Sequence, residues 1–299
     1  MNNRPYIYDE KANLTTLRDP MILPDGDTYY MTGTQPPYWN GINDGVHLWS
    51  SKDLKNWTDH GNILKRSELP EDFWGIDRFW APELFKTKKG KYILSFNSRN
   101  DSEKFHHDHG VGLAVADSVT GPYKIVTVKE PINTPTGDGG NDGSIFCDDD
   151  GQLYISFNGT KVLYTCRLNT ETWTIENPEV VCRAGEEGTW DSIGIEGPCI
   201  VKRHGIFFYW YSSWTSGYAA GVLTSRSIHG PWTKYPGNPI LSKSDIWKNG
   251  GHNNCFRGFD GKDYISFHAN MTDPSDGNIE RIFIRPVKYT ADGRVLWAF

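Results

Sequence analysis

The 299-residue chain lacks the features that mark membrane, nucleic-acid-binding and disulfide-stabilised proteins. No apolar stretch approaches the roughly 20 residues that a membrane-spanning helix needs. No Lys/Arg cluster stands out and the formal net charge is −6, which argues against a nucleic-acid partner. The five cysteines are odd in number and have no C-x-x-C spacing, so we expect buried free thiols and neither a disulfide framework nor a zinc site.

Two further absences concern the N-terminus and helices. The chain begins Met-Asn-Asn-Arg-Pro-Tyr and has no apolar signal-peptide core there. This predicts a cytoplasmic protein or a periplasmic or secreted one whose leader has been removed. Helical periodicity is nearly absent, whereas short β-rich runs bounded by turn residues are frequent. These runs favour an all-β fold.

Aromatic residues are abundant, at 14% of the chain with 12 Trp. Aromatic side chains suit pleated, half-buried strands, and their faces also stack on the apolar C–H faces of sugar rings. Hydrophobic residues make up 37% and charged residues 23%. This balance predicts a soluble, ordered domain with a sizeable core.

One unit recurs five times along the chain. Each copy has a polar strand start, a short apolar run, a glycine turn and an aromatic-rich strand, and the turn glycines are 64, 61, 54 and 56 residues apart. Each interval holds about four short strands, the size of a propeller blade. We therefore predict a single domain over residues 1–299, a five-bladed β-propeller. Its inner strands should begin near Asp19, Pro82, Asp142, Glu196 and His252.

The outer half of each repeat supplies a second pair of short strands. We expect the outermost strands at residues 54–57, 121–123, 173–175, 230–232 and 295–297. Loops 36–45 and 68–79 interrupt the pattern, and such loops wall the axial pocket of a propeller. Residues 148–151 contain three acids but lack the spaced ligands of an EF-hand, so we expect a hairpin turn there.

The repeat also places polar side chains at one point. The first strand of each blade lines the axis of a propeller, so Asp19, Asp142 and Glu196 should converge there from equivalent positions. Glu83 shares the axial position, and we expect it to be a structural hydrogen-bonding acid. Three acids on one axis are typical of an active site.

Five motifs in this order resemble glycoside hydrolase family 43, the five-bladed arabinanases, arabinofuranosidases and xylosidases. They span the chain from residue 17 onward, and Asp142 is followed by Gly-Ser where many relatives have Asp-Pro or similar. The motifs are Leu17-Arg-Asp-Pro20, Trp80-Ala-Pro-Glu-Leu84, Asn141-Asp-Gly-Ser-Ile-Phe146, Ile195-Glu-Gly-Pro198 and Gly251-His-Asn253.

The resemblance implies an inverting mechanism, which needs a proton donor on one face of the sugar and a base for water on the other. It implies that Asp19 is the general base and Glu196 the general acid. It also implies that Asp142 orients Glu196 and raises its pKa through like-charge proximity. The partner would be a carbohydrate that contains arabinose, xylose or galactofuranose.

Further residues are candidates for contacts with substrate or metal. We expect Trp80 at the floor of the pocket, and the resemblance implies an axial Ca²⁺ or Na⁺ held by His252 through water. The sequence His106-His-Asp-His109 is metal-like in composition, yet we favour loop histidines that face substrate or solvent. The other candidates for sugar contact are Arg18, Phe79, Trp214 and Arg281.

Several functions remain open at this point. The compact chain favours an exo-acting α-L-arabinofuranosidase, with β-D-xylosidase, β-D-galactofuranosidase and endo-arabinanase as alternatives within the family. A carbohydrate-binding propeller without catalysis is the alternative of another class, but it has no need of three axial acids. The sucrose- and fructan-cleaving propellers carry Arg-Asp-Pro in an interior blade, whereas Arg18-Asp-Pro20 lies in the first blade here, so a retaining mechanism is disfavoured.

Overall fold

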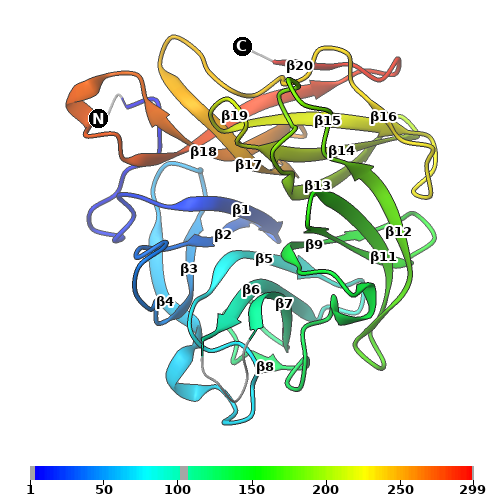
Figure 1. The fold of residues 1–299 in the computed structure, drawn as a ribbon. Coiled ribbons are helices and arrows are strands. Elements are labelled where there is room, and N and C mark those ends of the chain that lie inside the picture. Colours follow the sequence, from blue (N-terminus) through cyan, green and yellow to red (C-terminus); the bar gives the residue numbers. More distant parts are fainter. Residues whose placement is uncertain (1–3, 102–106, 298–299) are drawn as a thin grey trace.

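The computed structural model describes residues 4–101 and 107–297, with side chains left undescribed at 107 and 108, and it confirms the five-bladed β-propeller (Figure 1). Each blade is a four-stranded antiparallel sheet whose strands follow chain order from the axis outward. The first two blades comprise β1 (Arg18–Asp25), β2 (Thr28–Thr34), β3 (Gly45–Ser51) and β4 (Thr58–Lys65), then β5 (Trp80–Lys86), β6 (Tyr92–Asn100), β7 (His107–Ala116) and β8 (Lys124–Ile125). The third comprises β9 (Asn141–Cys147), β10 (Leu153–Gly159), β11 (Val162–Asn169) and β12 (Thr174–Arg183). The last two comprise β13 (Glu196–Arg203), β14 (Ile206–Ser213), β15 (Ala219–Ser225) and β16 (Thr233–Lys234), then β17 (Trp247–Arg257), β18 (Asp263–Met271), β19 (Glu280–Tyr289) and β20 (Val295–Trp297).

The five inner strands form a closed ring. Strand β1 contacts β5, β5 contacts β9, β9 contacts β13, β13 contacts β17, and β17 contacts β1. Helical structure in the described part of the chain is limited to three short 3₁₀ turns, η1 (Arg66–Glu68), η2 (Thr134–Thr136) and η3 (Pro274–Asp276). None of these turns is long or apolar enough to cross a membrane.

The core lies between the blades. Five large clusters of buried apolar side chains each join two neighbouring blades, so every interface around the ring has its own core. Because each sheet is covered on both faces, its middle strands are apolar without alternation. Strand β14 is buried along its whole length, and Phe208 and Trp210 on it pack toward blade 5 while Tyr209 and Tyr211 pack toward blade 3.

Every inner strand has the same irregularity, which lies near the start of β1, β5, β9 and β13 and in the middle of β17. The register of each inner strand against its neighbour advances by one extra residue there, as in a β-bulge. The extra residue has a left-handed backbone in all five copies, at Asp19 (φ 52°), Ala81 (43°), Asp142 (58°), Gly197 (60°) and His252 (43°). Asp, Asn, His and Gly tolerate this conformation better than other residues. The bulge therefore favours short polar residues at the axis.

The structure corrects four boundaries. Residues 54–57, 121–123 and 230–232 are turns that precede the outermost strands β4, β8 and β16. Gly121 and Gly230 have positive φ and each is followed by Pro, which has no N–H to donate to a sheet. Strand β17 begins at Trp247, so His252 lies inside this strand. The acidic segment 148–151 forms the predicted turn between β9 and β10.

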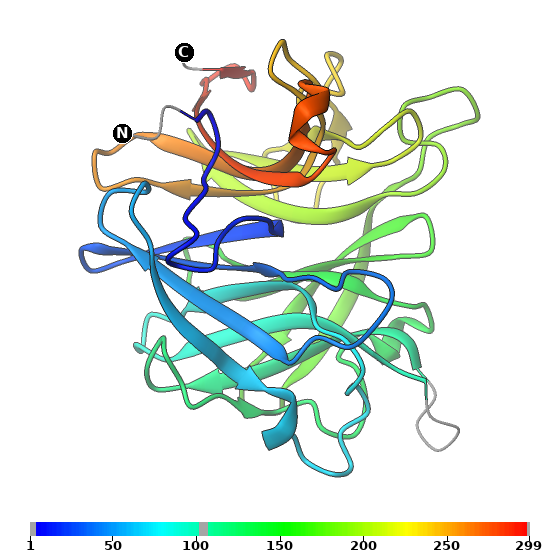
Figure 2. The same cartoon turned by 90° about the vertical axis from the view of Figure 1, so that its left-hand side faces the viewer.

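The N-terminal segment links the first and last blades, which Figure 2 shows as the blue segment between the blue and orange sheets. Ile7 forms an isolated antiparallel bridge with Ile282 of β19. On the other side, Trp49 of β3 donates its indole N–H to Ala12 O at 2.8 Å. This segment therefore adds to the direct packing of blade 5 against blade 1 that closes the ring. All five cysteines are free, as expected.

Candidate active site

The axial acids come together, but not from equivalent positions. Asp19, Asp142 and His252 occupy the left-handed position of the bulge in their strands, whereas Glu196 lies one residue before Gly197, which holds that position in blade 4. The expected equivalence of all three acids is therefore wrong by one residue for Glu196. A bulge places two residues opposite one, so consecutive positions can both reach the axis.

Glu83 also lies at a different level. Its register places it beyond the bulge of β5, level with Ser144 of β9. Burial is the main cause that raises the pKa of Glu83 to about 8, so this carboxyl is protonated at neutral pH. A hydrogen bond with Ser144 acts in the opposite direction. Glu83 is half-buried below the level of Asp19 and Asp142, and its role as a structural acid stays a prediction.

Asp142 is held rigidly beside the backbone of Glu196. Its Oδ1 accepts a hydrogen bond from Asn97 Nδ2 at 2.6 Å, and its own N–H donates to Asn97 Oδ1 at 2.6 Å. Its Oδ2 accepts from the N–H of Gly197 at 2.9 Å. One oxygen of Glu196 lies within 4.8 Å of an oxygen of Asp142. Asp142 is thus next to Glu196, as the adjacency of blades 3 and 4 predicts.

Asp19 is surrounded by donors and positive charge. Its Oδ2 accepts from Thr34 Oγ1 at 2.6 Å, and its Oδ1 lies 3.2 Å from His252 Nδ1. Burial by itself would raise the pKa of this carboxyl, but the charges of His252 and Arg18 and the Thr34 hydrogen bond outweigh it and lower the pKa to about 2. Asp19 is therefore ionised throughout the physiological range, as a general base must be.

Glu196 has the opposite electrostatic environment. Burial and the charge of Asp142 raise its pKa to about 7, against the opposing effects of His252 and a hydrogen bond from Tyr218. The hydroxyl of Tyr218 donates to Glu196 Oε1 at 2.5 Å, and the Tyr218 ring stacks on His268. A carboxyl that is still protonated near neutral pH can donate a proton to a leaving group.

His252 connects the two aspartates. Its Nδ1 is 3.2 Å from Asp19 Oδ1 and 3.8 Å from Asp142 Oδ2. Burial opposes protonation, but the charges of Asp19, Asp142 and Glu196 raise the pKa of His252 above its ordinary value. The imidazolium form therefore compensates the two carboxylates that face it.

Side chains of the second strands tie each blade to the next. On the second strand of a blade, one residue pairs with the inner-strand residue just before the left-handed position of the bulge. Its side chain accepts a hydrogen bond from the N–H of the left-handed residue in the following blade. The pairs are Ala81 N to Thr34 Oγ1, Asp142 N to Asn97 Oδ1, His252 N to Ser212 Oγ and Asp19 N to His268 Nδ1. The blade 3 to blade 4 step differs, because Gly197 N donates to Asp142, and Asn158 Oδ1 is buried with no hydrogen-bond partner among residues 4–101 and 107–297. At this step the contact between blades is a hydrogen bond from the strand of Glu196 to Asp142.

Two adjoining pockets meet at Glu196. A small pocket of about 80 Å³ contains the two aspartates and His252, and a larger one of about 480 Å³ continues outward past Tyr218. Arg18, Trp39 and Glu196 line both. Because Glu196 lies on this boundary, its carboxyl can reach a bond that joins a group in the small pocket to a group in the large one.

The predicted sugar-binding residues divide into two groups. Arg18 lines both pockets, Trp80 lines the small one and Trp214 the large one. Phe79 and Arg281 do not line either pocket and are buried elsewhere. Phe79 supports the strand before Trp80 through backbone bonds to the Asn43 side chain, and Arg281 pairs with Asp276 at 2.9 Å. The structure therefore does not bring these two residues together with the axial acids, because an aromatic or basic residue next to a motif can equally serve packing.

Trp80 forms a wall with little free surface. It is only 8% exposed, its Nε1 donates to Tyr38 O at 2.7 Å, and its ring lies 5.4 Å from that of His109. His109 lines the small pocket from strand β7 and not from a loop as predicted, while His106 lies outside the described residues.

The sequence interpretation missed several pocket residues. Loop 36–45 was expected to wall the pocket, but Tyr38 and Trp39 were not singled out. Asn97 and His268 were also missed, although Ser-Phe precedes Asn97, Asn158 and His268 alike. That echo is a signal that could have found them. The other missed residues are Asn141, Gly217, Tyr218, Asn249, Asn270 and Glu280.

The axial cluster does not fit a directly bound Ca²⁺ or Na⁺. Asp142, Glu196 and His252 offer donor atoms within 4.8 Å of one another. Ca²⁺ takes six to eight oxygen ligands, and the raised pKa of His252 favours a protonated ring with no lone pair to offer on Nδ1. An axial ion held through water stays a prediction.

Comparison with known proteins agrees with this geometry. A β-D-galactofuranosidase of Aspergillus niger is 28% identical over 82% of this chain and 75% of its own length. An extracellular exo-α-(1→5)-L-arabinofuranosidase of Cellvibrio japonicus is 24% identical over 94% and 86%. The crystal structure titled endo-1,4-β-xylanase from Bacteroides thetaiotaomicron has a TM-score of 0.78 and 26% identity, covering 96% of both chains. The model of glycosyl hydrolases family 43 matches residues 14–295. The chain therefore belongs to glycosyl hydrolases family 43 and is an inverting glycoside hydrolase.

Proposed function

We propose that this protein is an exo-acting α-L-arabinofuranosidase that removes single residues from the ends of oligosaccharides or polysaccharide side chains. The observation that carries the proposal is the small size of the pocket around Asp19 and Asp142, about 80 Å³ against about 480 Å³ for the adjoining pocket. A pocket of this kind favours one terminal sugar on the Asp19 side. The rest of the substrate would lie in the larger pocket.

In this proposal Asp19 and Glu196 act on opposite sides of the sugar. Asp19, ionised through its contacts with His252 and Thr34, removes a proton from the attacking water. Glu196 donates its proton to the glycosidic oxygen at the boundary of the two pockets, which frees the leaving group. Asp142 disfavours ionisation of Glu196 before the proton is needed. Their carboxyls should be about 6.5–9.5 Å apart to admit the water.

The larger pocket suits a sugar as leaving group. Trp39 and Trp214, which are 62% and 43% exposed, offer aromatic faces there. Asn249 and Asn270 supply amide groups that can bond hydroxyls. A sugar ring stacked on an indole would place its glycosidic oxygen toward Glu196.

Arg18 lies at the boundary of the two pockets and is paired there with an acid. Its guanidinium bonds Glu280 Oε1 at 2.9 Å and lies 4.9 Å from the ring of Trp39. Arg18 therefore stays in place between the two pockets, and its remaining N–H groups can donate to a substrate hydroxyl.

The test compares nitrophenyl α-L-arabinofuranoside, β-D-xyloside and β-D-galactofuranoside with linear arabinan. We expect the arabinofuranoside to be the best aryl substrate, arabinose to be the main product from arabinan, and the first product to have inverted configuration by NMR. Release of mainly oligosaccharides would instead assign an endo-arabinanase. Strong activity on the xyloside or galactofuranoside alone would assign those activities, and binding of arabinan without turnover would indicate a non-catalytic propeller.

A further inference from the structure

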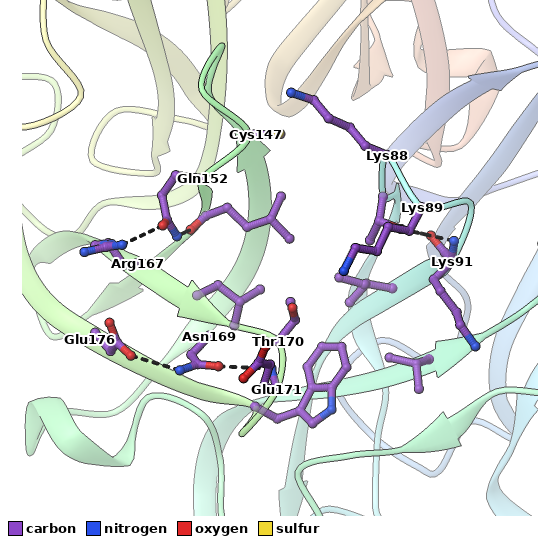
Figure 3. Close-up of a pocket in the computed structure, with 17 residues that line it drawn as sticks. Lys88, Lys89, Lys91, Cys147, Gln152, Arg167, Asn169, Thr170, Glu171 and Glu176 are labelled. Carbon is purple, nitrogen blue, oxygen red and sulfur yellow. Dashed lines mark hydrogen bonds between the residues drawn. The ribbon is translucent and has the colours of Figure 1, made fainter.

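A second cavity, of about 700 Å³, lies between blades 2 and 3 (Figure 3). It is bordered by the turn after β5 (residues 87–91), the turn after β9 (148–152) and the turn between β11 and β12 (170–173). The active site lies where the inner strands begin, whereas the turns after β5 and β9 lie where inner strands end. The cavity is therefore on the opposite face of the propeller and shares no residue with the catalytic pockets.

Trp173 gives this cavity an aromatic wall. It has a left-handed backbone (φ 57°), a conformation that a bulky residue rarely adopts. The preceding turn is held by Asn169, whose Oδ1 accepts from the N–H groups of Glu171 and Thr172 at 3.0 and 3.2 Å. One part of the indole packs on the core cluster between blades 2 and 3, and the rest faces the cavity. Leucine and isoleucine side chains continue this apolar floor.

Basic side chains line the cavity beside the aromatic wall, and the bordering turn also carries Asp148, Asp149 and Asp150. Four basic side chains line the cavity against two acidic ones, in a protein whose net charge is −6. Lys91 pairs with Asp117, and Arg167 donates to Gln152. Lys88 and Lys89 are exposed and have no ion-pair partner among residues 4–101 and 107–297. The two lysines are thus available to an anionic ligand.

The lysines and the aromatic wall come from different blades. Figure 3 shows Lys88, Lys89 and Lys91 on one side of the cavity, with Gln152, Arg167 and Asn169 on the other. A side chain built at Gly151 would lie 3.3 Å from Lys88 Nζ, so the ammonium group of blade 2 reaches the turn of blade 3. A ligand that contacts both sides would bridge the two blades.

We propose that this cavity binds an acidic polysaccharide, a glycan chain that carries uronate carboxylates. The Trp173 face would stack on a sugar ring, Lys88 and Lys89 would pair with carboxylates, and Gln152 and Thr170 would bond hydroxyls. A neutral glycan would leave the lysine charges unused, and a non-sugar polyanion would leave the apolar wall unused. The binding site would hold the enzyme on an acidic polymer while the opposite face cleaves a side chain.

The experiment uses the full chain with Asp19→Asn, so that no ligand is consumed. Polygalacturonate is the probe, with linear arabinan and poly-L-glutamate as the neutral-glycan and non-sugar comparisons, and dissociation constants are measured by calorimetry at two salt concentrations. We expect Trp173→Ala and Lys88→Ser/Lys89→Ser each to weaken polygalacturonate binding about tenfold or more. The lysine effect should shrink at high salt.

Trp39→Ala is the matched control, because Trp39 is an exposed tryptophan on the catalytic face. It should leave polygalacturonate binding unchanged. In the chain with Asp19 intact, Trp173→Ala should leave hydrolysis of small aryl glycosides unchanged, which separates this site from the active site. Failure of the arabinofuranosidase assignment would appear in that hydrolysis assay and would not alter the binding result.

Three outcomes would overturn the inference. One is polygalacturonate binding that neither set of substitutions weakens. Another is equal affinity for poly-L-glutamate, which would show that the site recognises negative charge and not a sugar. The third is tighter binding of neutral arabinan that depends on Trp173, which would remove the role of the two lysines. A circular dichroism spectrum like that of the parent would show that each variant is folded.

Discussion

Asp19 and Glu196 are both carboxyls at the propeller axis, yet their surroundings push their pKa values in opposite directions. At Asp19, positive charge from His252 and Arg18 outweighs the effect of burial and lowers the pKa to about 2. At Glu196, burial and the charge of Asp142 raise the pKa to about 7. Two titratable groups separated in this way are the signature of a base and an acid. The rate should therefore rise as Asp19 ionises near pH 2 and fall as Glu196 loses its proton near pH 7.

Replacing Asp19 with Asn should remove the base and leave the pocket. We expect kcat/KM to fall about 10²–10⁴-fold, because that is the usual contribution of a general base. The affinity for a released sugar, measured by calorimetry, should stay close to that of the parent. Near-native turnover would contradict the role of Asp19.

Replacing Glu196 with Gln should have an effect that depends on the leaving group. An alcohol leaving group needs the proton from Glu196, whereas nitrophenolate is stable without it. The measurement is kcat/KM on a nitrophenyl glycoside and on a natural oligosaccharide of the same sugar. We expect a much larger loss on the oligosaccharide, and equal losses on both substrates would argue against proton donation.

Asp142→Asn should shift the alkaline limb of the pH–rate profile to lower pH. The charge of Asp142 favours the protonated form of Glu196, so its removal lowers the pKa of Glu196 and the acid is lost earlier as pH rises. The acidic limb, set by Asp19, should move less. Asp292→Asn, at an exposed acid in a surface turn, is the control and should leave both limbs in place. A profile that Asp142→Asn leaves unchanged would refute this role.

At the scale of elements, the bulge in each inner strand is the feature that builds the site. It adds one residue to the strand and gives that residue a left-handed backbone, so Asp19, Asp142 and His252 sit at corresponding places of three blades. The neighbouring blade then supplies the hydrogen-bond partner of the bulge N–H. The blades therefore pack and position catalytic groups through the same contacts.

Thr34→Val tests this coupling with little change of shape. Thr34 Oγ1 donates to Asp19 Oδ2 and accepts from Ala81 N at 2.7 Å, and all three residues are buried. Loss of the hydroxyl leaves a buried N–H without its partner, so the free energy of unfolding should fall by about 1–3 kcal/mol.

The same change should raise the pKa of Asp19, because the Thr34 hydrogen bond favours its charged form. The acidic limb of the pH–rate profile should then move to higher pH. Thr58→Val, at an exposed position of β4, should change neither the limb nor the midpoint of urea unfolding. An unchanged midpoint for Thr34→Val would mean that this contact does not join the blades.

At the scale of the whole molecule, the N-terminal segment between blades 1 and 5 reinforces the direct packing that closes the ring. Arg281 of β19 donates to Thr15 O at 2.5 Å and pairs with Asp276 through two nitrogens, and it is 7% exposed. Arg285 donates to Pro5 O at 2.8 Å. Arg281 therefore holds the segment that precedes β1, outside the two pockets at the axis.

Arg281→Ala should lower the free energy of unfolding by about 1–3 kcal/mol, because Thr15 O loses its donor and the half-buried Asp276 keeps only the hydrogen bond from Tyr6. Well below the unfolding temperature, KM for a small aryl glycoside should change little. Arg294→Ala removes an exposed ion pair with Asp292 and should leave stability unchanged. A raised KM with unchanged stability would instead indicate that Arg281 contacts the substrate.

The sequence by itself determined the all-β class, the five blades, the order of their inner strands and the identity of the three acids. These follow from local patterns, since short apolar runs, glycine turns and their repeat spacing are set within each blade. Only the tertiary structure decided the one-residue offset of Glu196, the pairing of Asp142 with Asn97 and the positions of Tyr38, Trp39 and Tyr218. Those features depend on bulge register and on contacts between blades more than 40 residues apart, such as Asn97 with Asp142 and Trp80 with Tyr38. No local pattern records such contacts, because each partner is also compatible with an ordinary strand or loop.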